Sequence, residues 1–139
     1  MDYPITEIKG RGGDTEKMSI NLGVIDLGQI DLLVQEGFYS NRSDLIRTAI
    51  RNQLITHADT VKQTVARRTL AVGLQSYSRA DLERVQASGQ TLRIQALGLV
   101  RIAADVNPEL ARAVIESVSV LGAIQCSAAV RNALVDRIL

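Results

Sequence analysis

The stretch from Lys17 to Leu22 places hydrogen-bonding side chains at every second position. The polar members are Lys17, Ser19 and Asn21, and the apolar members are Met18, Ile20 and Leu22. Because successive side chains of a β-strand point to opposite faces, this alternation predicts a strand with one polar and one apolar face. A lone strand leaves backbone groups unpaired and its apolar face uncovered. The strand therefore needs a partner that the neighbouring sequence does not provide.

The residues that could support catalysis or metal binding form no convincing group. Cys126 is the only cysteine and occupies the position that Ile102 has in a preceding repeat, so we expect it to fill the core rather than act as a nucleophile. His57 is the only histidine and is far from Cys126 in sequence. The glycine-rich segment at residues 10–14 lacks the helix, Lys and Ser/Thr of a phosphate-binding loop. We therefore expect no enzyme, no metal and no cofactor.

Composition allows one or two small domains, since the chain has 139 residues of which 46% are apolar. Residues 1–60 carry six Lys/Arg against nine Asp/Glu, whereas residues 61–139 carry ten against six. With a net charge of only +1, any nucleic-acid binding must use a local patch. The single cysteine, together with the absence of a signal peptide or an apolar run long enough to span a membrane, predicts a cytoplasmic protein.

Two helical patterns follow the predicted strand. In the first, apolar residues recur on one face, and Gly37 can end the helix in the left-handed conformation. These residues are Leu27, Ile30, Leu33 and Val34. The second pattern begins after Ser40, a good N-cap, and its apolar stripe consists of Leu45, Ile46, Ala49, Ile50 and Leu54. No Gly or Pro occurs from Asn41 to Arg68, so this helix is expected to continue as a connector.

Strand, short helix, turn and longer helix in this order resemble the ribbon-helix-helix DNA-binding family of the Arc and CopG type. The resemblance covers about residues 15–54, through KMSINL, IDLGQIDLLVQEG and YSNRSDLIRTAIRNQL. In that family an identical chain supplies the second strand, and the antiparallel ribbon enters the major groove of double-stranded DNA. The resemblance therefore implies an obligate homodimer of β-α-α subunits. It also implies a cytoplasmic protein associated with the nucleoid.

The resemblance also assigns roles to residues. The outward strand face, Lys17, Ser19 and Asn21, corresponds to the base-reading positions, unless it is an ordinary solvated surface. The start of the second helix, Ser40, Asn41, Arg42 and Ser43, corresponds to the phosphate clamp, although both serines could be purely structural caps. The dimer core would be Met18, Ile20, Leu22, Leu45, Ile46, Ala49 and Ile50. Residues 1–14 are expected to form a flexible arm in which Lys9 and Arg11 could contact DNA, or a solvated tail without a role.

Other charged residues of this module bear on the strength of DNA binding. Arg47 and Arg51 are one helical turn apart, and we expect them on a solvated face with salt bridges rather than on DNA. Acidic residues in or near the module, among them Asp26 and Asp31, raise the electrostatic cost of approaching DNA. Cooperative binding of several dimers would compensate for this cost.

The C-terminal half contains an internal repeat. LGLVRIAADVNPELA at positions 97–111 matches LGAIQCSAAVRNALV at positions 121–135. A weaker copy, VGLQSYSRADLERV at positions 72–85, precedes the first by nearly the same offset. Each copy predicts a strand followed by a short helix, with Pro108 in the first helical turn. We expect about three β-α units, each of about 24 residues, stacked as a solenoid-like α/β domain; the alternative is an ordinary α+β domain that retains an old duplication.

The sequence thus predicts a mixed α/β protein with an arm (1–14), a ribbon-helix-helix domain with its connector helix (15–68) and a repeat domain (69–139). The expected function is a homodimeric, sequence-specific transcriptional regulator of repressor type, whose repeat domain mediates assembly into higher oligomers. The alternatives are a DNA-organising or partition protein that coats repeated sites, and an antitoxin-type regulator. Few genomic binding sites would indicate a regulator and many would indicate an organiser.

Overall fold

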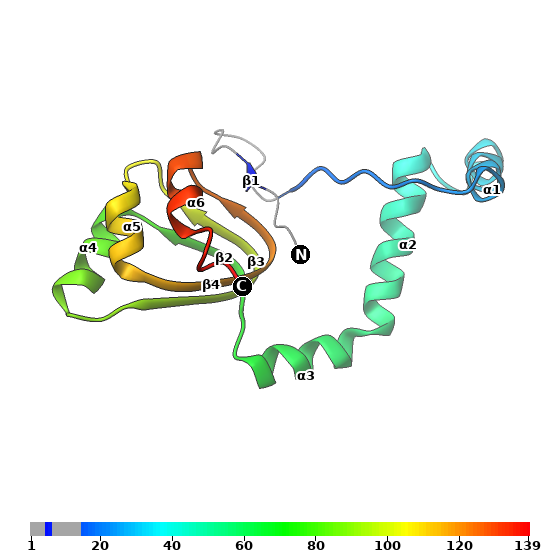
Figure 1. Ribbon diagram of the computed structural model, residues 1–139. Helices are drawn as coiled ribbons and strands as arrows, with labels where there is room; N and C mark the ends of the chain where they lie inside the picture. The colour runs from blue at the N-terminus through cyan, green and yellow to red at the C-terminus, as the bar shows by residue number, and fades with distance from the viewer. Residues whose placement is uncertain (1–4, 7–14) are drawn as a thin grey trace. The chain divides into compact units, whose positions relative to one another are not determined.

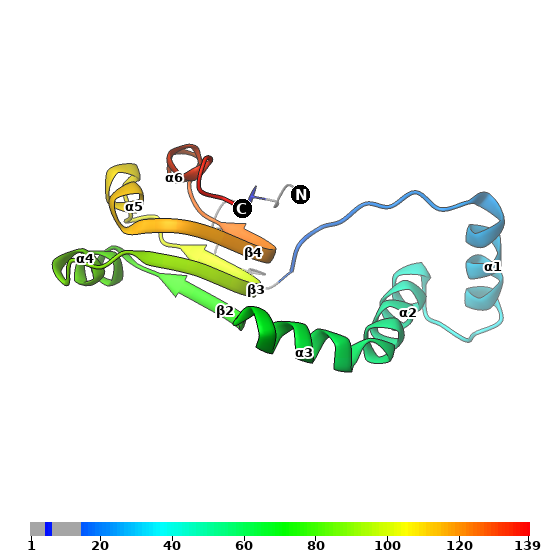
Figure 2. The same cartoon turned by 60° about the horizontal axis from the view of Figure 1, so that its bottom comes forward.

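The computed structural model describes residues 5–6 and 15–139, and these residues belong to two structural units. One unit is Lys17–Thr64, and the other is Val65–Leu139 together with the described N-terminal residues through Glu16. Figures 1 and 2 label the helices and strands. In chain order they are β1 (Ile5–Thr6), α1 (Val24–Gln35), α2 (Arg42–Thr56), α3 (Ala58–Arg68), β2 (Ala71–Tyr77), α4 (Arg79–Ala87), β3 (Leu92–Ile102), α5 (Pro108–Val114), β4 (Ile115–Gln125) and α6 (Ala128–Leu134).

Gly37 ends the first helix, as the sequence predicts. Its φ is +85°, and its N–H donates to the Val34 carbonyl oxygen while the Phe38 N–H donates to that of Leu33. These two bonds satisfy carbonyl groups that the end of a helix leaves without intrahelical partners. Glycine suits this position because a side chain would oppose the left-handed backbone.

The second predicted helix does not continue unbroken to Arg68. It is divided at His57, whose φ of −101° and ψ of 12° separate α2 from α3. Just before the break, the Thr56 hydroxyl donates to the Asn52 carbonyl oxygen at 3.1 Å, a local bond of the kind that bends helices. The absence of Gly and Pro therefore does not guarantee a continuous connector, because a β-branched residue with a competing hydroxyl stands at the break.

The C-terminal unit is a sheet of parallel strands in the order β1-β4-β3-β2. Strand and helix alternate from β2 to α6, which is the order expected for each repeat. Gly73 pairs with Gly98, and Gly98 pairs with Gly122, so the offset between copies of the sequence repeat is also the register of the sheet. Repeat units that are separate in sequence therefore become neighbouring strands.

Residues 5–6 change one detail of the sequence prediction. The sequence places them in a flexible arm, but Ile5 and Thr6 form β1 and pair with Ile124 and Gln125 of β4. So short a strand cannot produce a periodic pattern, and the sequence therefore could not reveal it. The predicted DNA-contacting residues Lys9 and Arg11 lie outside the described residues.

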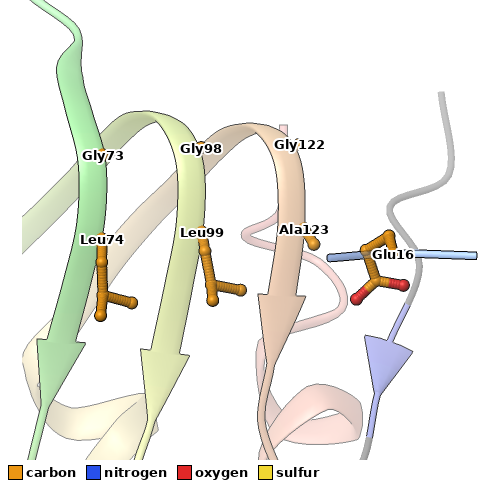
Figure 3. Close-up of a pocket in the computed structure, with 7 residues that line it drawn as sticks. All are labelled: Glu16, Gly73, Leu74, Gly98, Leu99, Gly122 and Ala123. Carbon is orange, nitrogen blue, oxygen red and sulfur yellow. The ribbon is translucent and has the colours of Figure 1, made fainter. Parts of the chain in front are cut away.

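A row of three glycines, Gly73, Gly98 and Gly122, crosses the sheet where its strands bend (Figure 3). Their φ angles are +109°, +134° and +126°, which L side chains rarely adopt. A Cβ atom on Gly98 would lie 2.4 Å from the Gly73 carbonyl oxygen, and one on Gly122 would lie 2.0 Å from that of Gly98. We call these residues the glycine row; both backbone angle and backbone proximity exclude larger residues at Gly98 and Gly122.

The hydrophobic core lies between the sheet and helices α4, α5 and α6, which follow one another in a row (Figures 1 and 2). Residues of β3, including Ile94, Ala96, Val100 and Ile102, are buried in it. Cys126 is also buried there, confirming the prediction that it fills the core, and burial raises the pKa of its thiol. Among the described residues, this core therefore belongs to the C-terminal unit.

Each helix of this core begins with a polar side chain that accepts a backbone N–H from the first helical turn. The capping residues are Ser78, Asn107 and Ser127, and Pro108 occupies the first turn of α5 as expected. At α4 the Asp81 carboxylate reciprocates by accepting the Ser78 N–H, which completes a capping box. These caps start each short helix at a defined position after the strand before it.

Replacing Gly122 with alanine tests the glycine row. The added methyl must displace the Gly98 carbonyl and adopt an unfavourable φ, so we expect a loss of about 3 kcal/mol in the free energy of unfolding. Urea denaturation of the full chain, followed by circular dichroism, measures this. The control is Gly28→Ala in α1, where nothing lies within 4 Å of the new methyl and alanine should stabilise the helix by up to about 1 kcal/mol. Equal effects of the two substitutions would contradict the steric role of the row.

Candidate nucleic-acid interface

The predicted ribbon residues lie in an exposed segment. Residues 15–23 have no regular secondary structure within the single chain, and the polar residues Lys17, Ser19 and Asn21 are all exposed. The alternating apolar residues Met18, Ile20 and Leu22 are 73%, 53% and 40% exposed. A strand is defined by hydrogen bonds to a neighbour, and one copy of the chain supplies none here. The strand and its base-reading face therefore remain predictions.

The helices of the N-terminal unit have no side chain that is buried within one copy of the chain. This holds for α1, for α2 and for α3, whose residues 65–68 belong to the other unit; the first two helices are rich in apolar residues. Of the predicted dimer core, Leu45 and Ile46 are half-buried, whereas Ala49 and Ile50 are exposed. An apolar surface of this extent on a small unit indicates an interface rather than a complete core.

The start of α2 is capped by Asn41 rather than by Ser40, so the predicted cap is displaced to the next position in the chain. The Asn41 side chain accepts the Asp44 N–H at 2.8 Å, and the Asp44 carboxylate accepts the Ser40 N–H at 2.9 Å. A capping side chain accepts an N–H two or three residues farther along the chain, so a cap at Ser40 would reach Arg42 or Ser43 rather than Asp44. An asparagine followed one helical turn later by a carboxylate is the sequence signal for this cap.

Two backbone N–H groups remain available at this helix start. Those of Arg42 and Ser43 have no hydrogen-bond partner among the described residues. They lie at the positive end of the helix dipole, where amide groups can bind an anion without any special side chain. The predicted phosphate-clamp residues, 40–43, are contiguous and exposed at this end.

Arg42 is held by a carboxylate of the preceding helix. Its Nε and one terminal nitrogen donate to the two Asp31 carboxylate oxygens at 2.7 and 2.8 Å. Hydrogen bonding from Arg42, followed by its charge, lowers the pKa of Asp31, and Asp31 in turn raises the pKa of Arg42. Both groups are therefore charged at neutral pH, and acid that protonates Asp31 weakens the pair. The sequence shows Asp31 as an unfavourable charge near DNA but does not reveal it as the partner of Arg42.

Two further cations, Arg47 and Arg51, lie on the exposed surface of α2. Neither has an ion-pair partner among the described residues, although both are expected from the sequence to form salt bridges on a solvated face. Their exposure agrees with the prediction, but the expected salt bridges are not formed within the described residues, and their position away from DNA stays a prediction.

A separate hollow of about 480 Å³ lies at the bend of the C-terminal sheet (Figure 3). The glycine row, Leu74, Leu99, Ala123 and Glu16 line it. The lining is mostly apolar, and Leu74, Leu99 and Ala123 occupy paired positions on neighbouring strands. Sequence reasoning does not identify this hollow, because it depends on the bend and on a residue distant in sequence.

The family model described as the ribbon-helix-helix transcriptional regulator family matches residues 13–131. The chain therefore belongs to this family, a class of DNA-binding transcriptional regulators. The match extends well beyond residues 15–54 and includes most of the repeat units. No curated protein and no solved structure matches the chain. In the described part of the chain, no helix is both long and apolar enough to cross a membrane.

Substitution of Asn41 by alanine tests the cap. Loss of the bond to the Asp44 N–H should lower the free energy of unfolding by about 1 kcal/mol. Thermal unfolding monitored by circular dichroism at fixed protein concentration provides the measurement. Ser40→Ala is the matched control, since Ser40 contributes its backbone N–H to this network and should change stability little. A larger loss for Ser40→Ala would show that Ser40 is the functional cap.

Proposed function

We propose that the protein is a homodimeric, sequence-specific regulator of transcription, acting as a repressor, whose two copies pair residues 17–22 as an antiparallel ribbon in the major groove of DNA. The observation that carries this proposal is the lack of any buried side chain in helices α1–α3 of one chain. Membership of the ribbon-helix-helix family supplies the arrangement that would bury this surface. The proposed dimer thus completes the core of the N-terminal unit.

Strand parity determines which face reads the bases. When Met18, Ile20 and Leu22 cover the dimer core, the alternate residues point outward. Lys17 can donate to guanine O6 and N7, and Asn21 can make a paired contact to adenine N6 and N7. The third polar residue, a serine, is small enough to let the ribbon approach the base edges and can donate or accept. With Ser19, the two longer side chains form the proposed base-reading face.

The start of α2 is the proposed phosphate clamp. The free N–H groups of Arg42 and Ser43 and the positive helix end favour a phosphate oxygen there. Asp31 already accepts two of the five Arg42 N–H groups and offsets its charge, so the guanidinium attracts phosphate less strongly while this pair holds. The backbone amides therefore carry the clamp, and Asp31 limits the contribution of the arginine.

Residues 69–139 are proposed to join ribbon dimers into higher oligomers. This part of the chain forms its own core without a partner. It can therefore add contacts between dimers without changing the ribbon. Linked dimers occupy neighbouring DNA sites at high effective concentration, which increases affinity without any new base contact.

Base reading is tested by Lys17→Ala and Asn21→Ala. Each should remove about 1–3 kcal/mol of discrimination between the preferred and unrelated DNA, because one base contact per subunit is lost. The preferred site is first selected from random duplexes with the wild-type protein, and affinities are then measured by fluorescence anisotropy. Lys62→Ala, which removes an exposed lysine from α3, is the control and should keep the discrimination. Unchanged discrimination in both ribbon variants would rule out the proposed parity.

Release of Arg42 is tested by Asp31→Asn. The freed guanidinium should contact phosphate, so affinity for specific and unrelated DNA should rise together. The slope of log K against log salt should become steeper by roughly two per dimer, one phosphate for each subunit. Asp59→Asn on α3 controls for the change in net charge. In an Arg42→Ala background the Asp31 substitution should lose most of its effect; an equal gain there would mean that Asp31 acts only by repelling DNA.

A further inference from the structure

Within residues 5–6 and 15–139, no strand pairs with the outer edge of β2. β2 is the last strand of the sheet and pairs only with β3, a pairing that the bond from the Ala103 N–H to the Tyr77 carbonyl oxygen extends. Alternate residues of such a strand point their N–H and C=O groups away from the sheet, where they can hydrogen-bond another strand. No other described segment is hydrogen-bonded along β2. This free edge can therefore accept one more strand.

The opposite edge of the sheet is covered. β1 pairs with the end of β4 at Ile124 and Gln125. Nearer the start of β4, the last residues of the chain make two backbone bonds with Val118: its N–H donates to the carbonyl oxygen of Arg137 at 2.9 Å, and its C=O accepts from Leu139 at 2.7 Å. A head-to-tail stack, in which β2 of one copy meets β4 of the next, is therefore blocked.

The free edge also lacks the residues that usually prevent strand addition. Edge strands are commonly protected by charged side chains, particularly lysine, or by proline. β2 contains neither, whereas the interior strand β3 contains Arg93 and Arg101 and the covered strand β4 contains Glu116. Val72 and Leu74 of β2 are 62% and 50% exposed. The edge with the least protection is thus the one without a partner in the described part of the chain.

The glycine row ends at this edge with an unfilled position. A Cβ on Gly122 would point at the Gly98 carbonyl, and one on Gly98 would point at the Gly73 carbonyl. A Cβ on Gly73 would meet nothing within 4 Å. Gly73 has a positive φ like the other two glycines. Unlike them, it has no neighbouring backbone in the described residues at the position to which its Cβ would point.

We propose that β2 pairs antiparallel with β2 of a second copy of this chain, with Gly73 opposite Gly73. A two-fold axis normal to the sheet through this point places the two bends side by side and on the same face, whereas a shifted register would set a bend against a straight segment. This register brings Val72 of each copy opposite Leu74 of the other, so both exposed apolar residues become covered. The β2 edges of both copies are used up in this pair, so no third copy can add to it.

This interface specifies how residues 69–139 would join ribbon dimers, and its role in DNA binding rests on the function proposed above. Ribbon pairing links two chains through the N-terminal units, and β2 pairing links two chains through the C-terminal units. In this arrangement the ribbon and β2 join each chain to two different neighbours, so together they produce species larger than a dimer. The β2 interface exists independently of the ribbon, so the two can be disrupted separately in the full-length chain.

The test compares four full-length proteins by light scattering coupled to gel filtration. Wild type should be larger than a dimer, Val72→Lys should be a ribbon dimer, and Ile20→Lys should be a β2-paired dimer. The double variant should be a monomer. Val135→Lys is the matched control, since Val135 is 64% exposed at the end of α6 and away from β2, and it should assemble as wild type does. Circular dichroism verifies that each variant keeps the C-terminal fold.

The outcomes separate the two interfaces. A monomeric Ile20→Lys protein, or a Val72→Lys protein with the wild-type mass, overturns β2 pairing. An Ile20→Lys protein that grows into an open series with concentration also overturns it, because a closed pair cannot extend. A dimeric wild type that becomes monomeric with Val72→Lys alone supports β2 pairing and overturns the ribbon dimer instead. Hydrogen exchange adds a second readout: β2 amides should exchange more slowly in wild type than in Val72→Lys.

Discussion

Close backbone contact along the glycine row is the constraint on which the C-terminal unit depends. At Gly98 and Gly122 a single methyl group would overlap the carbonyl of the neighbouring strand, and all three glycines have a positive φ. The strands can bend together only if each copy of the repeat places its glycine in register with the next. That requirement explains why the offset between copies is nearly constant along the chain. The same register places helices α4, α5 and α6 in a row over one core.

The two units bury apolar surface in different ways. The C-terminal unit completes its core within one chain, whereas the helices of the N-terminal unit leave their apolar side chains exposed or half-buried. In the proposed dimer, the stability of the DNA-binding unit depends on protein concentration, because folding and association are linked. Pairing through β2 would join such ribbon dimers to one another and so hold several DNA-binding units together. The family match spans both units, which fits such a shared role.

The charges at the proposed phosphate clamp keep its affinity for DNA below the maximum that this helix start could reach. Arg42 has an internal partner in Asp31, and Asp44 occupies the first turn of the helix whose amides would hold the phosphate. Both carboxylates oppose an approaching phosphate, while the free amides and the helix dipole attract it. A single dimer that binds DNA weakly occupies little of it alone. Linking dimers then raises the occupancy of DNA by a larger factor.

The sequence by itself determined the local elements, the repeat and the class of protein. Gly37 and Pro108 act through backbone geometry within a few residues, so their consequences can be predicted without knowledge of the fold. The offset of the repeat likewise indicated which strands become neighbours. The ion pair of Arg42 with Asp31, the break at His57, the covering of β4 by β1 and the last residues of the chain, and the open edge of β2 were decided only by the tertiary structure. Most of these features join residues that are distant in sequence, and the break at His57 depends on competition between nearby hydrogen bonds. Neither kind of feature leaves a periodic pattern in the sequence.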